Sequence, residues 1–408
     1  MCRTISAVAN DDEALARVSA ARRLAREAVW AAGGEPPAVA AASAHEADGG
    51  VGGGDVGEPL AIDLDATISI AHSDDKDGAG ATYKGTWGFH PMLAYLDRGD
   101  GTSEALAGRL RPGNAGANNA GDRLAVFAEA CWQLPELPAG LWRLVRADTA
   151  GASHAFLDAA RQAGWAFSVG FPLSPEIKDA IRDLPEAAWT PAITQCGDLR
   201  PDAEVAELTD TVDLTGWPAG SRLIVRCEPL HPGAQQTLDY VEGCRFTAFL
   251  TDQPDQGLAR LDARHRGHAR VEDCIRCDKD TGLRTLPCDT LARNAVWLEL
   301  ILSAHDLINY RVCVTAGNFP ATTCGNVVDN CISGYKTECL FKVESNKDYG
   351  DSDLMCTKIG DSGSPHFAYA VAYGIHNNSP KDTACGGWVK AEHAGEAARE
   401  MNVDILTS

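Results

Sequence analysis

The chain has 408 residues, a formal net charge of −21 at pH 7 and a sequence pI of about 4.9. Such a composition excludes a generally basic nucleic-acid coat, although a local basic patch can still bind a phosphate backbone. No apolar run reaches the ~18 residues of a membrane span, and the N-terminus lacks the regions of a signal peptide. We therefore expect a cytoplasmic protein without a membrane partner.

The cysteines divide the chain into two unlike parts. Eight of the 14 are scattered over the first three quarters, which is typical of a cytosolic protein. The other six crowd the end of the chain, at a density typical of secreted domains with several disulfides: Cys313, Cys324, Cys331, Cys339, Cys356 and Cys385. This contrast indicates a composite chain.

The first 58 residues are expected to form an N-terminal helix and a Gly-rich linker. Residues 12–32 have apolar residues at helical spacing, interleaved with arginines. We expect these arginines on a solvated helix face; contact with DNA phosphates is the alternative. Residues 33–58 are rich in Gly, Ala and Pro, which predicts a linker or long loop.

An acidic strand is predicted next, at residues 59–71. Asp63 and Asp65 stand two positions apart, so a strand directs both to the same face. A carboxylate within an apolar strand is costly unless a metal or a partner compensates it. This indicates a metal or catalytic role; the alternative is an acid at the strand end that caps a turn before Thr67.

Alternating strands and helices follow up to about residue 171. The predicted strands and helices lie at 82–96 and 104–111 (strands joined by the turn Asp100-Gly101), 121–133 (helix), 141–148 (strand), 153–163 (helix) and 165–171 (strand). This order predicts a mixed sheet with helices on its faces. If 59–71 and 141–148 are parallel neighbours, Asp65 and Asp148 meet where ligands bind in open α/β sheets.

Residues 172–260 contain short β-like runs and predict a β-rich insertion. Residues 259–279 then predict one helix, in which His265, His268, Glu272, Arg276 and Lys279 share a face. One interpretation is a salt-bridged surface helix. The other is a third metal-binding carboxylate, Glu272, among cations that bind phosphate.

Three carboxylates on two strands and a late helix suit phosphoryl transfer with two metal ions. Two divalent ions ~4 Å apart activate the attacking oxygen and stabilise the leaving oxygen. Carboxylate oxygens suit Mg²⁺ or Mn²⁺, and the protein mainly supplies position and charge.

These residues resemble the DDE transposases of bacterial insertion sequences, and Asp65, Asp148 and Glu272 match the acids of that class. The resemblance extends over about residues 2–308. Its most similar sequence motifs lie at 62–67, 71–74, 83–91, 110–116, 213–220 and 279–283. The resemblance implies an RNase H-like α/β core at 59–308, with helices on both faces of a mixed sheet and a β-rich insertion at about 172–260. It implies Mg²⁺-dependent cleavage and strand transfer of DNA at insertion-sequence ends.

The resemblance also implies partners and contacts. The expected partners are transposon ends and target DNA, bound by a homodimer associated with the bacterial nucleoid. The family signature Y-x2-R-x3-E-x6-K places its glutamate on Glu272 and its lysine on Lys279, but its tyrosine on His265 and its arginine on His268. The expected phosphate ligands are Arg264, Arg266, His268, Arg270, Arg276 and Lys279.

The family's N-terminal DNA-binding region and C-terminal helical end are not recognised in the chain. We therefore expect a truncated transposase, with an inactive chimeric fragment as the alternative.

The tail, 310–408, resembles the C-terminal half of a secreted chymotrypsin-like serine protease and predicts a small, Cys-rich, mostly-β unit. The run Gly360-Asp361-Ser362-Gly363-Ser364-Pro365 resembles the nucleophile loop of that family. The resemblance implies Ser362 as nucleophile and the amides of Gly360 and Ser362 as an oxyanion hole. The family's histidine and aspartate precede the serine, and no match to them is found there. A protease remnant is therefore the alternative function.

Overall fold

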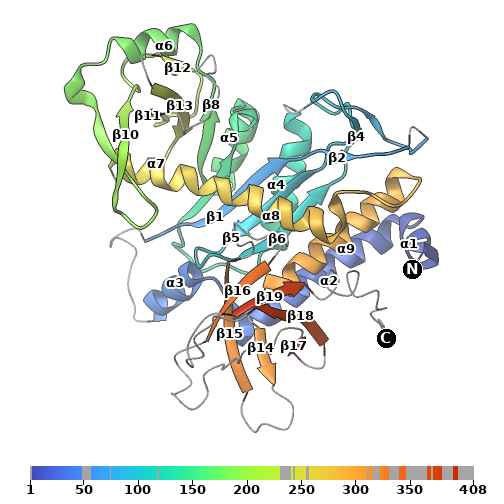
Figure 1. Ribbon diagram of the computed structural model, residues 1–408. Helices are drawn as coiled ribbons and strands as arrows, with labels where there is room; N and C mark the ends of the chain where they lie inside the picture. Colours follow the sequence, from blue (N-terminus) through green and yellow to red (C-terminus); the bar gives the residue numbers. More distant parts are fainter. Residues whose placement is uncertain are drawn as a thin grey trace.

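The computed structural model describes residues 2–47, 57–73, 75–116, 119–229, 240–241, 244–253 and 257–309, and the backbone of six strands between 312 and 393. Figure 1 shows the arrangement of these elements. No helix in the described ranges is both long and apolar enough to cross a membrane.

A ten-stranded mixed sheet organises the described part of the chain (Figure 1). Its path runs β6-β5-β1-β7-β8-β13-β11-β10-β9, and β12 pairs with β13 beside this path. The bounds are β1 (Leu60–Ala66), β5 (Met92–Asp97), β6 (Ser103–Arg109), β7 (Arg143–Ala147), β8 (Ala166–Phe171), β9 (Thr190–Ile193), β10 (Leu199–Glu207), β11 (Arg222–Glu228), β12 (Tyr240–Val241) and β13 (Cys244–Thr251).

The directions of the first five strands on this path determine where the candidate site lies. Strand β5 is antiparallel to both β1 and β6, whereas β1, β7 and β8 run parallel to one another. The expected mixed α/β sheet with helices is confirmed. In the register of β1 and β7, Leu64 lies opposite Ala147. The residues that follow, Asp65 and Asp148, therefore lie side by side at the carboxyl ends of the two strands.

Helices cover both faces of the sheet. They are α1 (Cys2–Ala9), α2 (Asp12–Val29), α3 (Pro37–Ala47), α4 (Ala120–Gln133), α5 (His154–Gln162), α6 (Pro175–Arg182), α7 (Leu258–Arg266), α8 (Arg270–Asp278) and α9 (Leu291–Asn309). Short π or 3₁₀ turns are η1 (Trp30–Gly34), η2 (Thr149–Gly151), η3 (Glu186–Ala188), η4 (Gly267–Ala269) and η5 (Lys279–Leu283).

The alternation of side chains along the strands separates two apolar cores. On β1, Leu60, Ile62 and Leu64 pack with α4 and α5 in one core. On β5, Leu93 and Tyr95 point the other way and pack with α8 and α9 in a second core. Because the period of a strand is two, Asp63 and Asp65 lie on the face of the sheet opposite Leu64. Helix α8 covers the face that carries these two aspartates.

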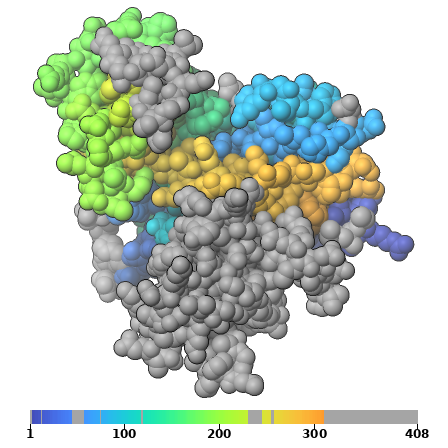
Figure 2. Space-filling view, in the orientation of Figure 1, coloured from blue at the N-terminus to red at the C-terminus, as the bar shows by residue number. Residues whose placement is uncertain are grey.

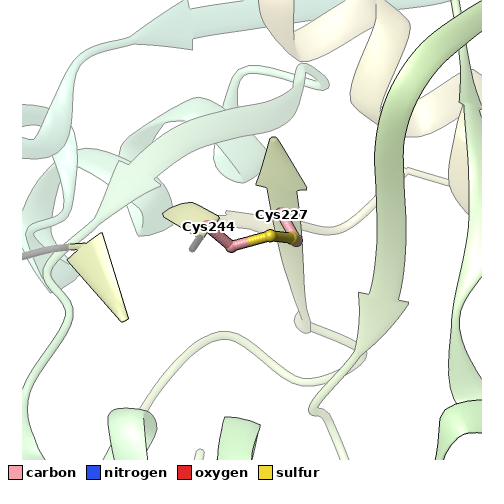
Figure 3. The surroundings of a disulfide bond; sticks show 2 residues. All are labelled: Cys227 and Cys244. Carbon is pink, nitrogen blue, oxygen red and sulfur yellow. A yellow bond between two sulfur atoms is a disulfide. The ribbon is translucent and has the colours of Figure 1, made fainter. Parts of the chain in front are cut away.

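The insertion extends the same sheet. Strand β13 pairs antiparallel with β8, and β11, β10 and β9 follow outward from it. A disulfide joins Cys227 on β11 to Cys244 on β13, with 5.6 Å between their Cα atoms (Figure 3). Helix α6 also belongs to this segment; Ser174 caps it by accepting a hydrogen bond from the backbone N–H of Ile177.

Two expectations for the N-terminal part are wrong. The predicted linker contains α3, because a run of alanines behind Pro37 favours a helix more strongly than its small residues favour a loop. Arg22 and Arg26 of α2 are buried instead of solvated. Arg26 pairs with Glu104 at 2.6 Å and Asp306 at 2.7 Å, and Arg22 pairs with Glu299 at 2.9 Å. These pairs fasten α2 to β6 and α9.

Two smaller sheets complete the described elements. One contains β2 (Ser69–Ile70), β3 (Gly80–Ala81) and β4 (Trp87–Phe89), in the order β2-β4-β3. The other, in the order β14-β15-β16-β19-β18-β17, contains β14 (Val312–Thr315), β15 (Thr322–Asp329), β16 (Leu340–Ser345), β17 (Pro365–Ala368), β18 (Val371–Asn378) and β19 (Val389–His393). The predicted nucleophile loop, with Gly360, Asp361 and Ser362, lies outside the described residues.

Candidate active site

Asp65 and Asp148 stand at the carboxyl ends of two neighbouring parallel strands. Asp65 is on β1, partly buried, and its Oδ1 accepts a hydrogen bond from the N–H of Ala66 at 2.7 Å. Asp148 follows β7, is exposed, and caps η2 by accepting from the N–H of Ala150 at 3.1 Å. The parallel pairing of β1 and β7 therefore brings these two predicted acids to one edge of the sheet.

Glu272 approaches the same edge from α8, in whose first turn it lies exposed. The pKa of Asp65 is raised from 3.8 to about 6, mainly by burial; the charges of Asp148 and Glu272 contribute to the rise, while His268 acts in the opposite direction. Three segments that are far apart in the chain thus place their carboxylates within electrostatic range of one another. Figure 1 shows α8 crossing in front of the central strands.

Asp63, two residues before Asp65, has a different environment. It is buried and accepts two hydrogen bonds from Arg146 on β7, at 2.8 and 2.6 Å. Arg146 also pairs with Asp97 at 2.6 Å, and Arg270 donates to Asp97 at 2.5 Å. Asp63 is thus compensated by an arginine, whereas no arginine pair compensates Asp65 among the described contacts.

The helix expected at 259–279 is present as the contiguous elements α7, η4 and α8, but one turn of it is 3₁₀. The 3₁₀ turn η4 separates α7 from α8, and Gly267 lies in it. A Cβ at Gly267 would collide with Nη1 of Arg146, which also donates to the carbonyl of Arg264 at 2.9 Å. The chain therefore tightens at this glycine so that a buried arginine can reach the backbone.

The two histidines at the signature positions have different environments. His265 belongs to the protein interior, and His268 belongs to the hydrogen-bond network of Asp63 and Arg146. The ring of His265 is buried, stacks on Phe249 at 4.3 Å between centroids, and its Nδ1 lies 2.9 Å from Oγ of Ser168. The expectation that the whole face is non-core is therefore wrong at His265. Nδ1 of His268 lies 2.8 Å from Oδ1 of Asp63, so His268 connects η4 to β1.

The predicted phosphate ligands fall into three settings. Arg264 is buried over the Trp142 ring at 4.5 Å and pairs with Glu58 at 3.0 Å, and Arg266 pairs with Asp262 at 2.8 Å. Arg270 and Arg276 are exposed and pair with Asp97 and Asp273. Lys279 is partly buried, and Asp65 acts on its charge.

Two further cations near the acids were not predicted from the sequence. Arg123 on α4 donates to the carbonyl of Ala150 in η2, and both Asp148 and Asp65 act on its charge. Burial lowers the pKa of Lys279, and Lys84 lowers it further, so these two lysines are close. Lys84 lies within the quoted stretch 83–91, which the resemblance marked without indicating a role.

The acids fit a divalent cation by the chemistry of their donors. They are carboxylates, which suit a hard divalent ion, and the pKa of Asp65 is raised by its burial and by the neighbouring charges of Asp148 and Glu272. As the described part stands, no group of three or more His, Cys, Asp or Glu residues is arranged to hold an ion.

A serine–histidine–aspartate relay occurs elsewhere, between β6, α9 and α8. Nε2 of His305 lies 3.0 Å from Oγ of Ser103, and its Nδ1 lies 2.7 Å from Oδ1 of Asp278. Tyr95 donates to the other carboxylate oxygen at 2.6 Å. All four side chains are buried, so no peptide substrate reaches the serine, and the relay joins strands to helices.

The family model described as Transposase DDE domain group 1 matches residues 55–318, which is more than half of the chain. The chain belongs to this transposase family. The search of curated proteins gives no match.

Membership accounts for the composition of the site. A transposase DDE domain binds and recombines DNA and generally uses divalent metal ions, which explains why exposed acids and cations meet at one edge of the sheet. The matched range includes Asp65, Asp148 and Glu272, and the path β6-β5-β1-β7-β8 is consistent with an RNase H-like domain. The fusion of this transposase domain to a protease fragment stays a prediction.

Proposed function

We propose that this chain is a DDE transposase that cleaves DNA at insertion-sequence ends and transfers the strand to a target, with Asp65, Asp148 and Glu272 as its catalytic and metal-binding acids. The observation that carries the proposal is the convergence of the three carboxylates, in which Asp148 and Glu272 raise the pKa of Asp65. They come from two parallel strand ends and one helix, and such carboxylates can hold the divalent ions that metal-dependent phosphoryl transfer uses.

Each acid has a distinct position relative to DNA. Asp148 and Glu272 are exposed, so metal ions held by them would be accessible to a DNA phosphate, whereas Asp65 is partly buried on β1 of the sheet. Two Mg²⁺ or Mn²⁺ ions held by these residues would supply an activated attacking oxygen and a stabilised leaving oxygen. Arg123 holds η2 through the Ala150 carbonyl and so positions Asp148.

The cations divide between holding the helix and contacting DNA. Arg264, Arg266 and His268 pair with Glu58, Asp262 and Asp63, so we assign them to the support of α7 and η4. Arg276 and Lys279 lie four and seven positions after Glu272, on its side of the helix, and we assign them to DNA phosphates. Arg270 donates to Asp97, so we assign it to support as well. A homodimer on paired transposon ends is the proposed assembly.

Calorimetric titration with Mn²⁺ tests the metal site directly. We expect binding by the wild-type chain and its loss in Asp65→Ala, Asp148→Ala and Glu272→Ala. Asp273→Ala is a matched control, because Asp273 is an exposed acid next to Glu272 that pairs with Arg276 at 2.6 Å. Binding that survives in each of the three variants, with the fold checked by circular dichroism, would contradict the proposed site.

Strand cleavage then tests the reaction. The wild-type chain, with Mg²⁺ and a library of DNA duplexes that carry inverted-repeat ends, is expected to nick the DNA next to the repeat. The nick should be absent in the three alanine variants and present in Asp273→Ala. Nicking that does not depend on the acids would assign the activity to a contaminant.

A further inference from the structure

The three-stranded sheet β2-β4-β3 is fixed at its base and exposed at its tip. The N–H of Asp77 donates to the carbonyl of Asp289 at 2.9 Å, and Asp77 Oδ2 accepts from the N–H of Leu291 at 3.1 Å. On another side, the N–H of Gly113 donates to the carbonyl of Gly78 at 3.2 Å. These bonds fasten the base of the sheet to the start of α9 and to the loop before α4.

A tight turn at the tip presents two side chains. The N–H of Thr82 donates to the carbonyl of Thr86 at 2.8 Å, and the N–H of Gly85 donates back to Thr82 at 3.0 Å. Gly85 has a φ of 74°, which closes the turn in the left-handed region. Tyr83 and Lys84 therefore project from the turn, with Nζ of Lys84 5.6 Å from the centre of the Tyr83 ring.

Exposed aromatic surface is concentrated on this sheet. Tyr83 is 68% exposed and Trp87, at the start of β4, is 40% exposed. Among the described residues, Trp132 at the far end of α4 is the other large aromatic side chain exposed to this degree, at 42%. The Tyr83 ring contacts the ring of His90, with 5.4 Å between their centroids, and the rest of it is open to a flat ligand.

The turn lies beside the candidate active site. Lys84 is close enough to Lys279 to lower its pKa, and Asp65 acts on Lys279 in turn. In Figure 2 the light-blue surface that includes the small sheet borders the gold surface of the late helices. The exposed ring is thus next to Lys84, whose charge acts on Lys279 beside the acids.

We propose that Tyr83 stacks on an unpaired base of the DNA strand next to the phosphate that is cut, while Lys84 contacts the backbone of that strand. This inference rests on the proposed function and adds a second contact surface to it. A single strand fits better than a duplex, because the faces of its bases are accessible to an aromatic ring. The neighbouring lysines supply the charge that its backbone requires.

Fluorescence anisotropy with a labelled oligothymidylate of about 20 nucleotides, and with a duplex of the same length, tests the inference. Stacking of one base predicts that Tyr83→Ala weakens single-strand binding by about tenfold and leaves duplex binding within about twofold. Tyr83→Phe keeps the ring and should bind as the wild type does. Trp132→Ala is the matched control, because it removes an exposed aromatic ring about 13 Å further along α4 than Arg123.

Salt dependence separates the lysine from the ring. Lys84→Gln should reduce the slope of log affinity against log salt for the single strand by about 0.7, as expected for one lost phosphate contact, whereas Tyr83→Ala should leave the slope unchanged.

The possible outcomes distinguish this inference from the proposed function. Equal single-strand affinity of Tyr83→Ala and the wild type, or equal weakening by Tyr83→Phe and Tyr83→Ala, overturns the stacking contact and leaves the transposase proposal intact. A wild-type chain that binds neither DNA overturns both. Circular dichroism of each variant establishes that an exposed substitution has left the fold unchanged.

Discussion

Asp65 should reduce the stability of the protein at neutral pH, and Asp65→Asn should restore it. Burial and the carboxylates of Asp148 and Glu272 raise the pKa of Asp65 from 3.8 to about 6. Between these values the folded protein binds a proton that the unfolded chain has released, so stability falls as the pH rises through this window. Each pKa unit corresponds to about 1.4 kcal/mol, so ionised Asp65 lowers the free energy of unfolding by about 3 kcal/mol.

Urea unfolding at about pH 4 and about pH 8 measures this effect. At the lower pH, Asp65→Asn and the wild type should have similar stability, because most of the carboxyl group is already protonated in the fold. At the higher pH, the variant should be more stable by about 2–3 kcal/mol. Equal stability at both values would refute the argument that Asp65 is an uncompensated buried charge.

Asp63→Asn is the matched control, on the same strand and the same face. Its carboxylate accepts hydrogen bonds from Arg146 at 2.8 and 2.6 Å, so removing its charge leaves a buried arginine without a full partner. We expect a loss of about 3–5 kcal/mol at pH 8. Opposite signs for two aspartates two residues apart would be difficult to explain by general effects of mutation.

The remaining predictions concern ions and the buried arginines. At about pH 8, Mg²⁺ should raise the thermal unfolding midpoint of the wild-type protein but not that of Asp65→Asn. The same two proteins without metal ions are the control. Arg146→Met should destabilise the fold by about 3–5 kcal/mol in urea, because it removes the buried guanidinium that pairs with both Asp63 and Asp97; a loss below about 1 kcal/mol would contradict the network. Arg26→Ala should cost a similar amount, whereas Arg17→Ala, at an exposed pair, should change stability by less than about 0.5 kcal/mol.

The sequence carried enough information to place the central strands and two of the acids. Alternating apolar residues around Asp63 and Asp65 define β1, and the run that ends at Asp148 defines β7. Their parallel pairing, stated as a condition, is present in the register of Leu64 with Ala147. The spacing around Glu272 led to the third acid, and the catalytic roles of all three stay predictions.

Long-range contacts explain what the sequence did not reveal. Arg26 meets Glu104 and Asp306, which are 78 and 280 positions away, so no local pattern distinguishes it from a solvated arginine. The 3₁₀ turn at Gly267 leaves room for Arg146, a residue of β7 that is far away in the sequence. Lys84 and Arg123 reach the site from a turn and a helix whose docking has no periodic signature.

The continuous ladder from β6 to β9 has a mechanical consequence. Because β13 is hydrogen-bonded to β8, the insertion cannot swing on a flexible hinge relative to the strands that carry the acids. The strands of the insertion are therefore held at a fixed distance from Asp65 on β1. Amide exchange should then protect β8 and β13 together, as one cooperatively opening unit.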